Sequence, residues 1–315
     1  CGTMTSGGTE SILMAMRAYR QAGYERGIRY PEIVCSETAH CAFKKAADYF
    51  KMKLTSIPVD PVSRKVNLRA MANAISSNTV VLVGSAPHFP HGIVDPIEEM
   101  AAIGRGCSVG VHVDCCLGGF ILPFMDRSGY PIPPFDFRVK GVTSISADTH
   151  KYGYTPKGTS VVMYSNHKLR RHQYFVETSW PGGVYATPTI AGSRPGALIA
   201  TCWATMRFMG VEGYVDMARR IVGTARKIKA ALKGIPGVFV MGDPLASIVA
   251  FGSKEFDVYR LYAAMTKKGW HLSSLQYPPS VHICLTAIHT DEGVADRFIG
   301  DMKECASAIM KTPKA

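Results

Sequence analysis

The stretch Thr143-Ser-Ile-Ser-Ala-Asp-Thr-His-Lys-Tyr-Gly-Tyr-Thr-Pro-Lys-Gly-Thr159 joins two segments that read as strands, residues 142–146 before it and residues 160–165 after it. Between these segments the chain releases His150 and Lys151 together at a strand end. A lysine in such a place becomes a nucleophile toward carbonyl carbons when burial or a nearby cation lowers its pKa. The alternative is an ordinary solvated loop lysine, and the surrounding chain decides between the two.

The chain before this stretch alternates between short apolar strands and amphipathic helices. We expect helices over residues 10–26, 40–52, 68–75 and 96–103, and strands over residues 33–36, 54–59, 80–84 and 109–114. This alternation predicts an α/β fold with a mostly parallel sheet and right-handed crossovers. Ligands of such sheets bind outside the carboxyl ends of the strands. The rule places His40, Asp114 and the pair His150 and Lys151 along one edge.

From about residue 194 the pattern changes to that of a smaller α+β unit. The expected elements are helices over residues 196–208, 214–233 and 256–267, strands over residues 238–240, 247–251 and 281–285, and a terminal helix. The sequence therefore predicts a large domain over residues 1–208 and a small C-terminal domain over residues 209–315.

Composition excludes several classes of protein. The 315 residues are 47% hydrophobic with a net charge of +12, but the basic residues are spread along helices, which argues against a nucleic-acid partner. Nine cysteines without a CxxC pair indicate reduced thiols in a cytosolic-type compartment. We expect no metal site and, lacking a long apolar run, no membrane span in this stretch of chain. Because it starts mid-motif without Met, we expect a natural N-terminal part to be missing.

Three features in chain order suit pyridoxal 5'-phosphate (PLP). Ser6, Gly7, Gly8 and Thr9 at a helix start can cradle a phosphate. Asp114 at a strand end can keep the pyridine nitrogen protonated, and Lys151 can bond to the aldehyde carbon. His40 could stack on the ring, although it could also be a plain helix-start histidine.

Four motifs resemble the sphingosine-1-phosphate lyases. They are Thr5-Ser-Gly-Gly-Thr-Glu-Ser-Ile12, His112-Val-Asp-Cys-Cys-Leu-Gly-Gly-Phe120, Gly141-Val-Thr-Ser-Ile-Ser-Ala-Asp-Thr-His-Lys-Tyr-Gly-Tyr154 and Pro188-Thr-Ile-Ala-Gly-Ser-Arg-Pro-Gly196. The likeness runs nearly end to end. It implies the PLP-dependent transferase-like fold (fold type I) and cleavage of the C2–C3 bond of a phosphorylated sphingoid base. The products would be a long-chain aldehyde and phosphoethanolamine.

The resemblance also implies roles for single residues. The catalytic set would be Lys151, Asp114, His40 and His91, and the cofactor would further contact Ser6, Gly7, Gly8, Thr9, His112, His150, Gly192 and Ser193. Lys157, six residues after Lys151, would bind the substrate phosphate, although it could be an exposed loop lysine. The family implies a homodimer with shared active sites. In eukaryotic members, a preceding segment anchors the cytosol-facing catalytic domain in the endoplasmic reticulum membrane.

Two questions remain open at this stage. The base that takes the proton of the substrate 3-hydroxyl could be His91, Lys151 or a tyrosine; His88 lies in the same segment as His91. The rival activity is a PLP-dependent amino-acid decarboxylase with the same cofactor contacts. A basic binding module would rest on charge alone and would leave the pairing of Asp114 with Lys151 unexplained.

Overall fold

A seven-stranded sheet forms the centre of the N-terminal two thirds of the protein. The structure, a computed structural model, describes residues 1–313. Within them the strand order is β1-β7-β6-β5-β4-β2-β3. The strands are β1 (Gly2–Thr5), β2 (Glu32–Ser36), β3 (Lys53–Ile57), β4 (Thr79–Ser85), β5 (Gly110–Cys115), β6 (Val142–Ala147) and β7 (Ser160–Tyr164). Strand β7 runs antiparallel to both its neighbours and the other pairs are parallel, so the expected mostly parallel sheet is confirmed.

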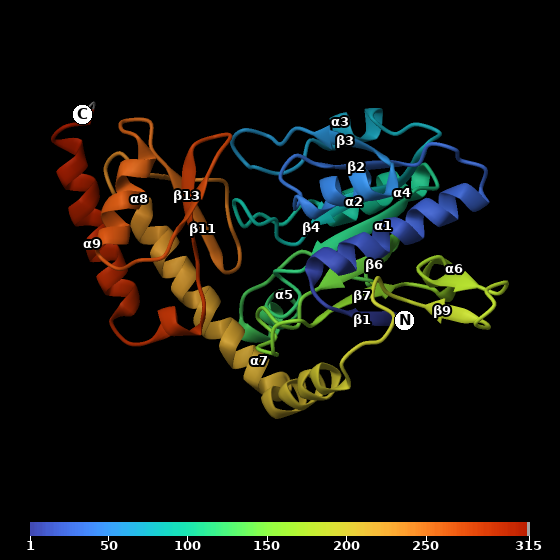
Figure 1. The fold of residues 1–315 in the computed structure, drawn as a ribbon. Coiled ribbons are helices and arrows are strands. Elements are labelled where there is room, and N and C mark those ends of the chain that lie inside the picture. The colour runs from blue at the N-terminus through green and yellow to red at the C-terminus, as the bar shows by residue number, and fades with distance from the viewer. Residues whose placement is uncertain (314–315) are drawn as a thin grey trace.

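Helices cover both faces of this sheet (Figure 1). Val81 and Val83 of β4 pack into a core with α1 (Gly8–Glu25) and α2 (Ala42–Phe50). Leu82, between them, faces the opposite core, which contains α4 (Ile97–Gly106). This division follows from the strand geometry, since successive side chains point to opposite faces. The remaining helical elements of this part are α3 (Leu68–Asn73), α5 (Leu122–Met125), η1 (Asp126–Ser128) and α6 (His167–Arg171).

A smaller unit follows, joined to the large sheet by the long helix α7 (Gly196–Leu232) (Figure 1). Gly210 interrupts α7 with φ 59° and ψ 178°, so the chain contains two helical segments here, as the sequence predicts. The second sheet is antiparallel, in the order β10-β11-β13-β12. Its elements are β10 (Phe239–Val240), β11 (Ile248–Gly252), α8 (Val258–Lys267), β12 (Ser273–Leu275), β13 (Ser280–Cys284), η2 (Ala287–Thr290) and α9 (Val294–Met310).

Some elements differ from the sequence predictions. The sequence predicted no strand before the glycine-rich turn, but residues 2–5 form β1, which pairs with the distant strand β7. A hairpin of β8 (Phe175–Glu177) and β9 (Tyr185–Thr187) was also not predicted. Four- and three-residue strands are too short to show a period in sequence. Among the described helices, none is both long and apolar enough to cross a bilayer.

Candidate active site

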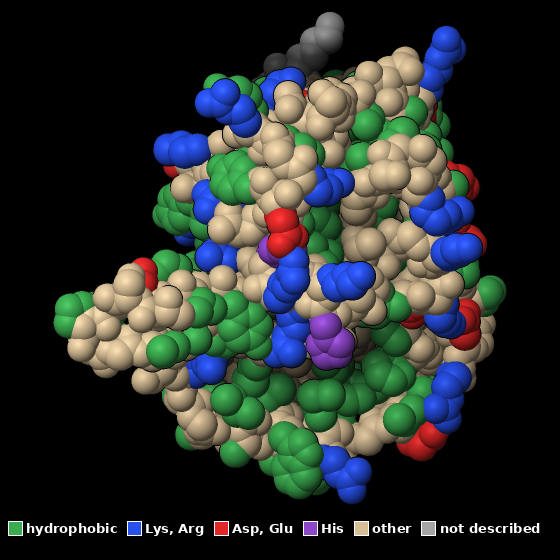
Figure 2. All heavy atoms as spheres, turned by 90° about the vertical axis from the view of Figure 1, so that its right-hand side faces the viewer, with side chains coloured by type: hydrophobic (Ala, Val, Ile, Leu, Met, Phe, Trp, Pro, Cys, Tyr) green, Lys and Arg blue, Asp and Glu red, His purple; other side chains and the backbone are tan. Residues whose placement is uncertain are grey.

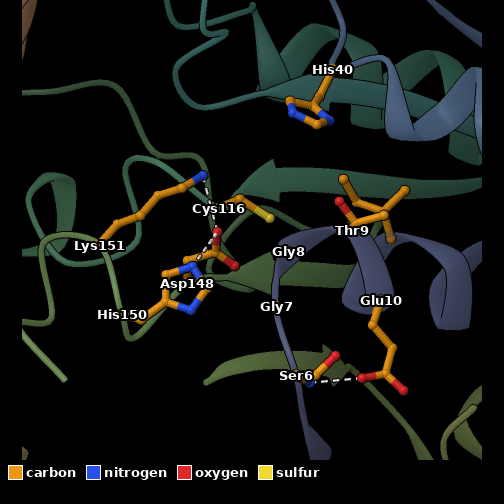
Figure 3. Close-up of a pocket in the computed structure, with 11 residues that line it drawn as sticks. Ser6, Gly7, Gly8, Thr9, Glu10, His40, Cys116, Asp148, His150 and Lys151 are labelled. Atoms are coloured by element: carbon orange, nitrogen blue, oxygen red, sulfur yellow. Dashed lines mark hydrogen bonds and ion pairs between the residues drawn. The ribbon is translucent and has the colours of Figure 1, made fainter. Parts of the chain in front are cut away.

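A cavity of about 390 Å³ opens at the carboxyl edge of the large sheet (Figure 3). Its walls come from the N-terminus of α1, the segment before α2, and the segments after β5 and β6. The lining residues are Ser6, Gly7, Gly8, Thr9, Glu10, Ile12, His40, Cys116, Asp148, His150 and Lys151. Seven of the residues expected to contact a cofactor therefore lie around one cavity, whose volume suits a small molecule.

The glycine-rich turn brings the first turn of α1 to the cavity. Gly7 precedes the helix, and no side chain in the described part of the chain caps it. Backbone N–H groups at such a helix start attract an anion, helped by the helix dipole. The turn also lies very close to the floor of the site. A Cβ atom on Gly8 would lie 2.7 Å from Asp148 Oδ2 and 2.8 Å from Cys116 Sγ, so only glycine fits there.

Lys151 and Asp148 form an ion pair within the cavity (Figure 3). The amine Nζ lies 2.9 Å from Oδ2 of Asp148, whose side chain is 2% exposed against 35% for Lys151. Burial alone would lower the pKa of Lys151, but the neighbouring carboxylates, Asp148 first among them, outweigh burial, and the pKa is raised. The expected lowering of the lysine pKa is therefore absent here. The second oxygen, Oδ1 of Asp148, is buried without a hydrogen-bond partner among the described residues.

His150 presents a hydrogen-bond donor to the same space. Its Nδ1 accepts the backbone N–H of Thr159 at 3.2 Å, which places the ring proton on Nε2. That nitrogen lies 3.7 Å from Asp148 Oδ2. Burial lowers the pKa of His150, Asp148 opposes this effect, and the charges of Lys157 and Lys151 lower it further. His150 is thus a neutral N–H donor placed beside the helix start.

Asp114 lies at the end of β5, buried but for 7% of its surface. Its Oδ1 accepts the backbone N–H of Cys116 at 2.9 Å and the hydroxyl of Ser146 at 3.2 Å. No hydrogen bond among the described residues uses its other oxygen, Oδ2. One acceptor atom of a fixed carboxylate therefore remains available.

The donor set fits PLP. A helix N-terminus and His150 suit a phosphate group, Lys151 supplies an amine, and Asp114 has a free carboxylate oxygen for a protonated ring nitrogen. His40 stands on the opposite side of the cavity from Asp148 (Figure 3). Its Nδ1 accepts the backbone N–H of Ala42 at 3.1 Å, which fixes the ring at the start of α2. The ring is thereby placed where it could cover a flat molecule.

Six of the residues expected to act at the site lie outside the cavity lining: Asp114, His91, His112, Lys157, Gly192 and Ser193. His112 is fully buried behind Asp114. Lys157 is exposed in the turn after Lys151, and Gly192 and Ser193 belong to the segment between β9 and α7. Ser193 lines a neighbouring cavity of about 430 Å³ that shares Ser6 and Glu10 with the first.

His91 lies among other histidines and away from the cavity. Its backbone N–H donates to Nδ1 of His88 at 3.3 Å, and the two rings meet edge to face, 5.4 Å apart. His282 of β13 donates from Nδ1 to the carbonyl of Pro90 at 2.9 Å, which holds this segment against the small sheet. Burial and the neighbouring His88 lower the pKa of His91 to about 3.

Sequence reasoning missed four residues of the cavity wall, namely Glu10, Ile12, Cys116 and Asp148. Asp148 lies three residues before Lys151, a spacing that could have suggested the pair. Cys116 follows Asp114 by two residues. Glu10, in the first turn of α1, accepts the backbone N–H of Ser6 at 2.7 Å and that of Ile190 at 3.0 Å. It thereby ties the glycine-rich turn to the segment before α7, a contact that no local pattern reveals.

Comparison with known proteins places these features in a family. The family model described as "Pyridoxal-dependent decarboxylase conserved domain" matches residues 1–254. Sphingosine-1-phosphate lyase 1 of Rattus norvegicus is 55% identical over 316 residues, covering 100% of this chain and 56% of that protein. The sphingosine-1-phosphate lyase of Saccharomyces cerevisiae is 47% identical over 318 residues, covering 99% of this chain and 54% of that protein. The chain thus spans about half the length of the curated relatives it matches.

Solved structures agree with the sequence comparison. A sphingosine-1-phosphate lyase of Burkholderia pseudomallei superposes with a TM-score of 0.96 at 47% identity, covering 99% of this chain and 71% of that one. A glutamate decarboxylase of Lactobacillus brevis has a TM-score of 0.83 at 21% identity, covering 100% of this chain and 76% of that one. The second likeness shows the fold alone, and it confirms the predicted PLP-dependent fold class.

Proposed function

We propose that this chain, which belongs to the sphingosine-1-phosphate lyase family of pyridoxal-dependent proteins, cleaves the C2–C3 bond of a phosphorylated sphingoid base. The products are a long-chain aldehyde and phosphoethanolamine. The observation that carries the proposal is the grouping of Lys151, Asp148 and His150 against the N-terminus of α1 in one cavity. A primary amine beside an anion-binding helix start is the arrangement that a phosphorylated aldehyde cofactor requires.

Four groups at the site would hold the cofactor. The first turn of α1 and Nε2–H of His150 would hold its phosphate, Lys151 would bond to its aldehyde carbon, and Asp114 Oδ2 would accept its ring N–H. When bound, PLP accepts the electron pair released as the substrate carbon–carbon bond breaks. Asp114 supports that chemistry because an adjacent carboxylate favours the protonated, electron-withdrawing ring.

Lys151 is the strongest of the expected bases for the substrate 3-hydroxyl. It lines the cavity, and its amine is held by Asp148 at 2.9 Å. His91 is a poorer candidate because it lies outside the lining and its pKa is lowered to about 3, which makes it a weak base. Because Asp148 favours the protonated amine, Lys151 could act as this base only when its nitrogen is released from the cofactor as a neutral amine, and it would then hold the proton that it takes.

Lys157 binds the substrate phosphate in this proposal. The turn that carries it contains two left-handed residues, Tyr154 (φ 59°) and Gly158 (φ 94°), which reverse the chain direction. The charge of Lys157 contributes to the lowered pKa of His150, a residue of the cavity lining. Because the helix start serves the cofactor phosphate, a second phosphate needs a separate cation such as Lys157.

We further propose that two copies of the chain pair through an exposed apolar face and share their active sites. Trp180 and Val184 of the hairpin are 56% and 76% exposed, and Trp203 and Phe208 of α7 are 66% and 90% exposed. Figure 2 shows hydrophobic side chains gathered on this side of the molecule. Apolar groups in such number mark a surface that is covered in an assembly. The variant Phe208→Asp should lower the molecular mass measured by light scattering, and an unchanged mass would contradict this part of the proposal.

The expected location of the full-length eukaryotic protein at the endoplasmic reticulum stays a prediction. Within the described residues, no helix spans a bilayer. The cellular location of a fluorescent fusion of the full-length protein, compared with that of a fusion that begins at Cys1, would test whether a preceding segment directs the protein to the endoplasmic reticulum.

The experiment that tests the activity is a product analysis. The protein loaded with PLP receives a phosphorylated sphingoid base, and long-chain aldehyde and phosphoethanolamine are measured by mass spectrometry. Lys151→Ala is the control. Parallel samples receive amino acids, and released carbon dioxide is measured. Carbon dioxide without aldehyde would overturn the lyase proposal in favour of the rival decarboxylase.

A further inference from the structure

We propose that a directional chain of buried hydrogen bonds, running from Tyr19 through Ser144, His112 and Ser146, ends on Asp114 and tunes the carboxylate that binds the cofactor ring nitrogen. The inference rests on the PLP site of the proposed function, but not on its substrate. In this view His112, which sequence reasoning placed in direct contact with PLP, is a positioning residue that acts through Ser146.

The contacts are continuous and short. Tyr19 Oη lies 2.6 Å from Ser144 Oγ, which lies 2.7 Å from His112 Nδ1. On the other side of the ring, His112 Nε2 lies 3.2 Å from Ser146 Oγ, which donates to Asp114 Oδ1 at 3.2 Å. Thus the imidazole bridges two hydroxyls, and the chain spans α1 and the two central strands.

The sheet register creates this arrangement. Strands β5 and β6 are parallel neighbours, with His112 opposite Ser144 and Asp114 opposite Ser146. Side chains two residues apart in a strand share a face, so all four side chains point to the face covered by α1. Tyr19 reaches them from that helix. Each residue type is therefore needed at its register position for the chain to be continuous.

Proton counting sets the direction of the chain. A carboxylate has no proton to give, so Ser146 donates to Asp114 and must accept from His112 Nε2–H. The neutral imidazole then has a bare Nδ1, which accepts from Ser144. The Ser144 hydroxyl must therefore accept the single proton of Tyr19, whose oxygen also lies 2.7 Å from Thr143 Oγ1. All the donors point toward Asp114. Such aligned chains strengthen each member by polarisation.

Burying these four polar side chains costs free energy that apolar side chains would not, and this cost argues that the hydrogen-bond chain has a function. Tyr19, Ser144, His112 and Ser146 are each at most 3% exposed. Burial lowers the pKa of His112 to about 4, so the ring is neutral near pH 7 and forms no ion pair. Buried polar side chains stabilise a core no better than apolar ones of equal size unless every group is satisfied. Here every member of the hydrogen-bond chain has a partner, and the chain ends at a carboxylate whose second oxygen takes part in no hydrogen bond among the described residues.

Two consequences for Asp114 follow. Its Oδ1 receives both Ser146 Oγ–H and the N–H of Cys116, which fixes the rotation of the carboxyl group and leaves Oδ2 for the ring nitrogen. Donors to Oδ1 also favour the ionised form. Lys151 adds a positive charge nearby, whereas the thiols of Cys115 and Cys116 are neutral because burial raises their pKa values.

The test uses PLP labelled with ¹⁵N in the ring, so that the nitrogen chemical shift reports its protonation. Ser146→Ala removes the last link. The expected result is a shift toward the unprotonated nitrogen and a loss of PLP affinity of about tenfold, as for one hydrogen bond to a charged group. Ser146→Thr keeps the hydroxyl and should restore the wild-type values.

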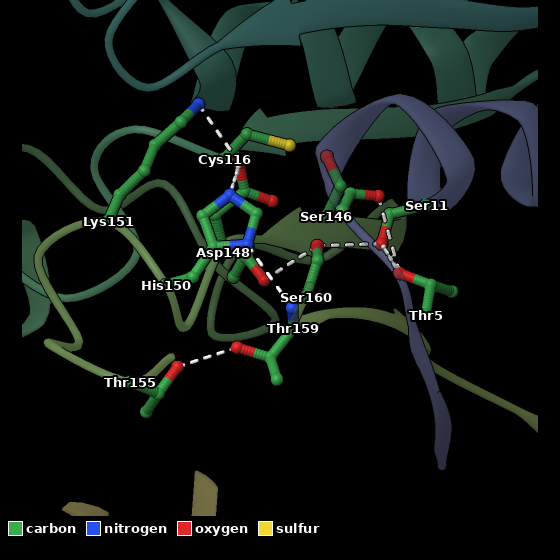
Figure 4. A network of polar contacts seen from close by, with 12 residues as sticks. Thr5, Ser11, Cys116, Ser146, Asp148, His150, Lys151, Thr155, Thr159 and Ser160 are labelled. Carbon is green, nitrogen blue, oxygen red and sulfur yellow. Dashed lines mark hydrogen bonds and ion pairs between the residues drawn. The ribbon is translucent and has the colours of Figure 1, made fainter. Parts of the chain in front are cut away.

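The matched control is Ser160→Ala. Ser160 is as buried as Ser146, and its hydroxyl belongs to a separate series of hydrogen bonds (Figure 4). In that series, Ser160 Oγ lies 2.8 Å from Ser11 Oγ, which lies 2.6 Å from Thr5 Oγ1. Among the described residues, these hydroxyls make no hydrogen bond to Asp114. Ser160→Ala should therefore leave the ¹⁵N shift unchanged. Equal effects of Ser146→Ala and Ser160→Ala would mean that a buried hydroxyl matters only for packing, and would overturn the inference.

A second pair of variants, at His112, tests the same inference if Ser146→Ala does not fold. His112→Gln can still donate to Ser146 and accept from Ser144, whereas His112→Leu breaks the chain with similar volume. Only the leucine variant should change the ¹⁵N shift, and equal shifts in both would overturn the inference. Because neither readout uses substrate, a protein with the expected shifts but no lyase activity would refute the proposed function and leave this inference standing.

Discussion

The side chain of Tyr152 anchors the residue next to Lys151 to the C-terminal unit. It is buried, and its hydroxyl donates to the carbonyl of Leu285 at 2.6 Å and lies 3.3 Å from Cys284 Sγ. The substitution Tyr152→Phe removes this hydroxyl and keeps the ring. We expect both a loss of stability and a weaker hold on Lys151.

The energy of the hydrogen bond from Tyr152 to Leu285 sets the size of the expected effect. A buried carbonyl that loses its donor costs about 1–3 kcal/mol. If that energy appears wholly as displacement of the Lys151 amine, turnover and covalent attachment of PLP fall by roughly 5- to 150-fold. Tyr259→Phe is the matched control, because its hydroxyl donates to the carbonyl of Leu275 at 2.5 Å within the same unit, far along the chain from Lys151.

The assay measures both variants by urea unfolding and by the rate of PLP attachment, followed by its absorbance. Tyr152→Phe and Tyr259→Phe should lose similar stability, but only Tyr152→Phe should attach PLP slowly. If both variants attach PLP at equal rates, the bond from Tyr152 to Leu285 is structural only, and the reasoning that links the C-terminal unit to Lys151 fails.

Four further predictions follow from the site and its surroundings. Lys151→Ala should abolish turnover and leave no borohydride-reducible pyridoxyl link on the chain; such a link found by mass spectrometry at another residue would contradict the role of Lys151. Asp114→Asn should still bind PLP but turn over far more slowly, because a neutral partner does not hold the ring nitrogen protonated; a near wild-type rate would remove Asp114 from the chemistry. Lys157→Ala should weaken inhibition by phosphoethanolamine by roughly ten- to a hundredfold and leave PLP affinity unchanged, as expected for a charge-assisted bond to phosphate; the two titrations would refute the assignment if PLP binding fell instead. Burial lowers the pKa of His88 and His91 from 6.5 to about 4 and about 3, so the stability they contribute is full above pH 6.5 and is lost as pH falls toward those values. For His88 this amounts to about 3 kcal/mol at most, and urea midpoints measured from pH 7 to pH 4 should fall less steeply in His88→Gln than in the wild type.

The sequence predicted the parts of the site that local patterns encode. The glycine-rich start of α1 and the strand end before Lys151 are contiguous signals, and the parallel-sheet rule brought them to one edge. Family membership and the PLP-dependent fold are confirmed by the comparisons. The domain boundary near residue 208 stays a prediction, as do the individual roles of the site residues.

The features that escaped prediction depend on tertiary contacts. Asp148 raises the pKa of Lys151 because the two side chains meet in space, and no composition rule gives the sign of that shift. Glu10 bonds to Ile190, 180 residues away. The place of His112 follows from the alternation of side chains in β5, but only the register with β6 shows which hydroxyls it meets.

The pairing of β1 with β7 bears on how the protein acquires its cofactor during synthesis. The phosphate turn directly follows β1. Within residues 1–313, the neighbour of β1 in the sheet is β7 alone, a strand that ends at Tyr164. The turn is then tied by Glu10 to Ile190. A ribosome-bound chain therefore exposes the turn long before its supports exist, and such long-range pairing is slow to form. Cofactor capture is consequently a late step of biogenesis, and truncated translation products ending before Ile190 should be unable to retain PLP.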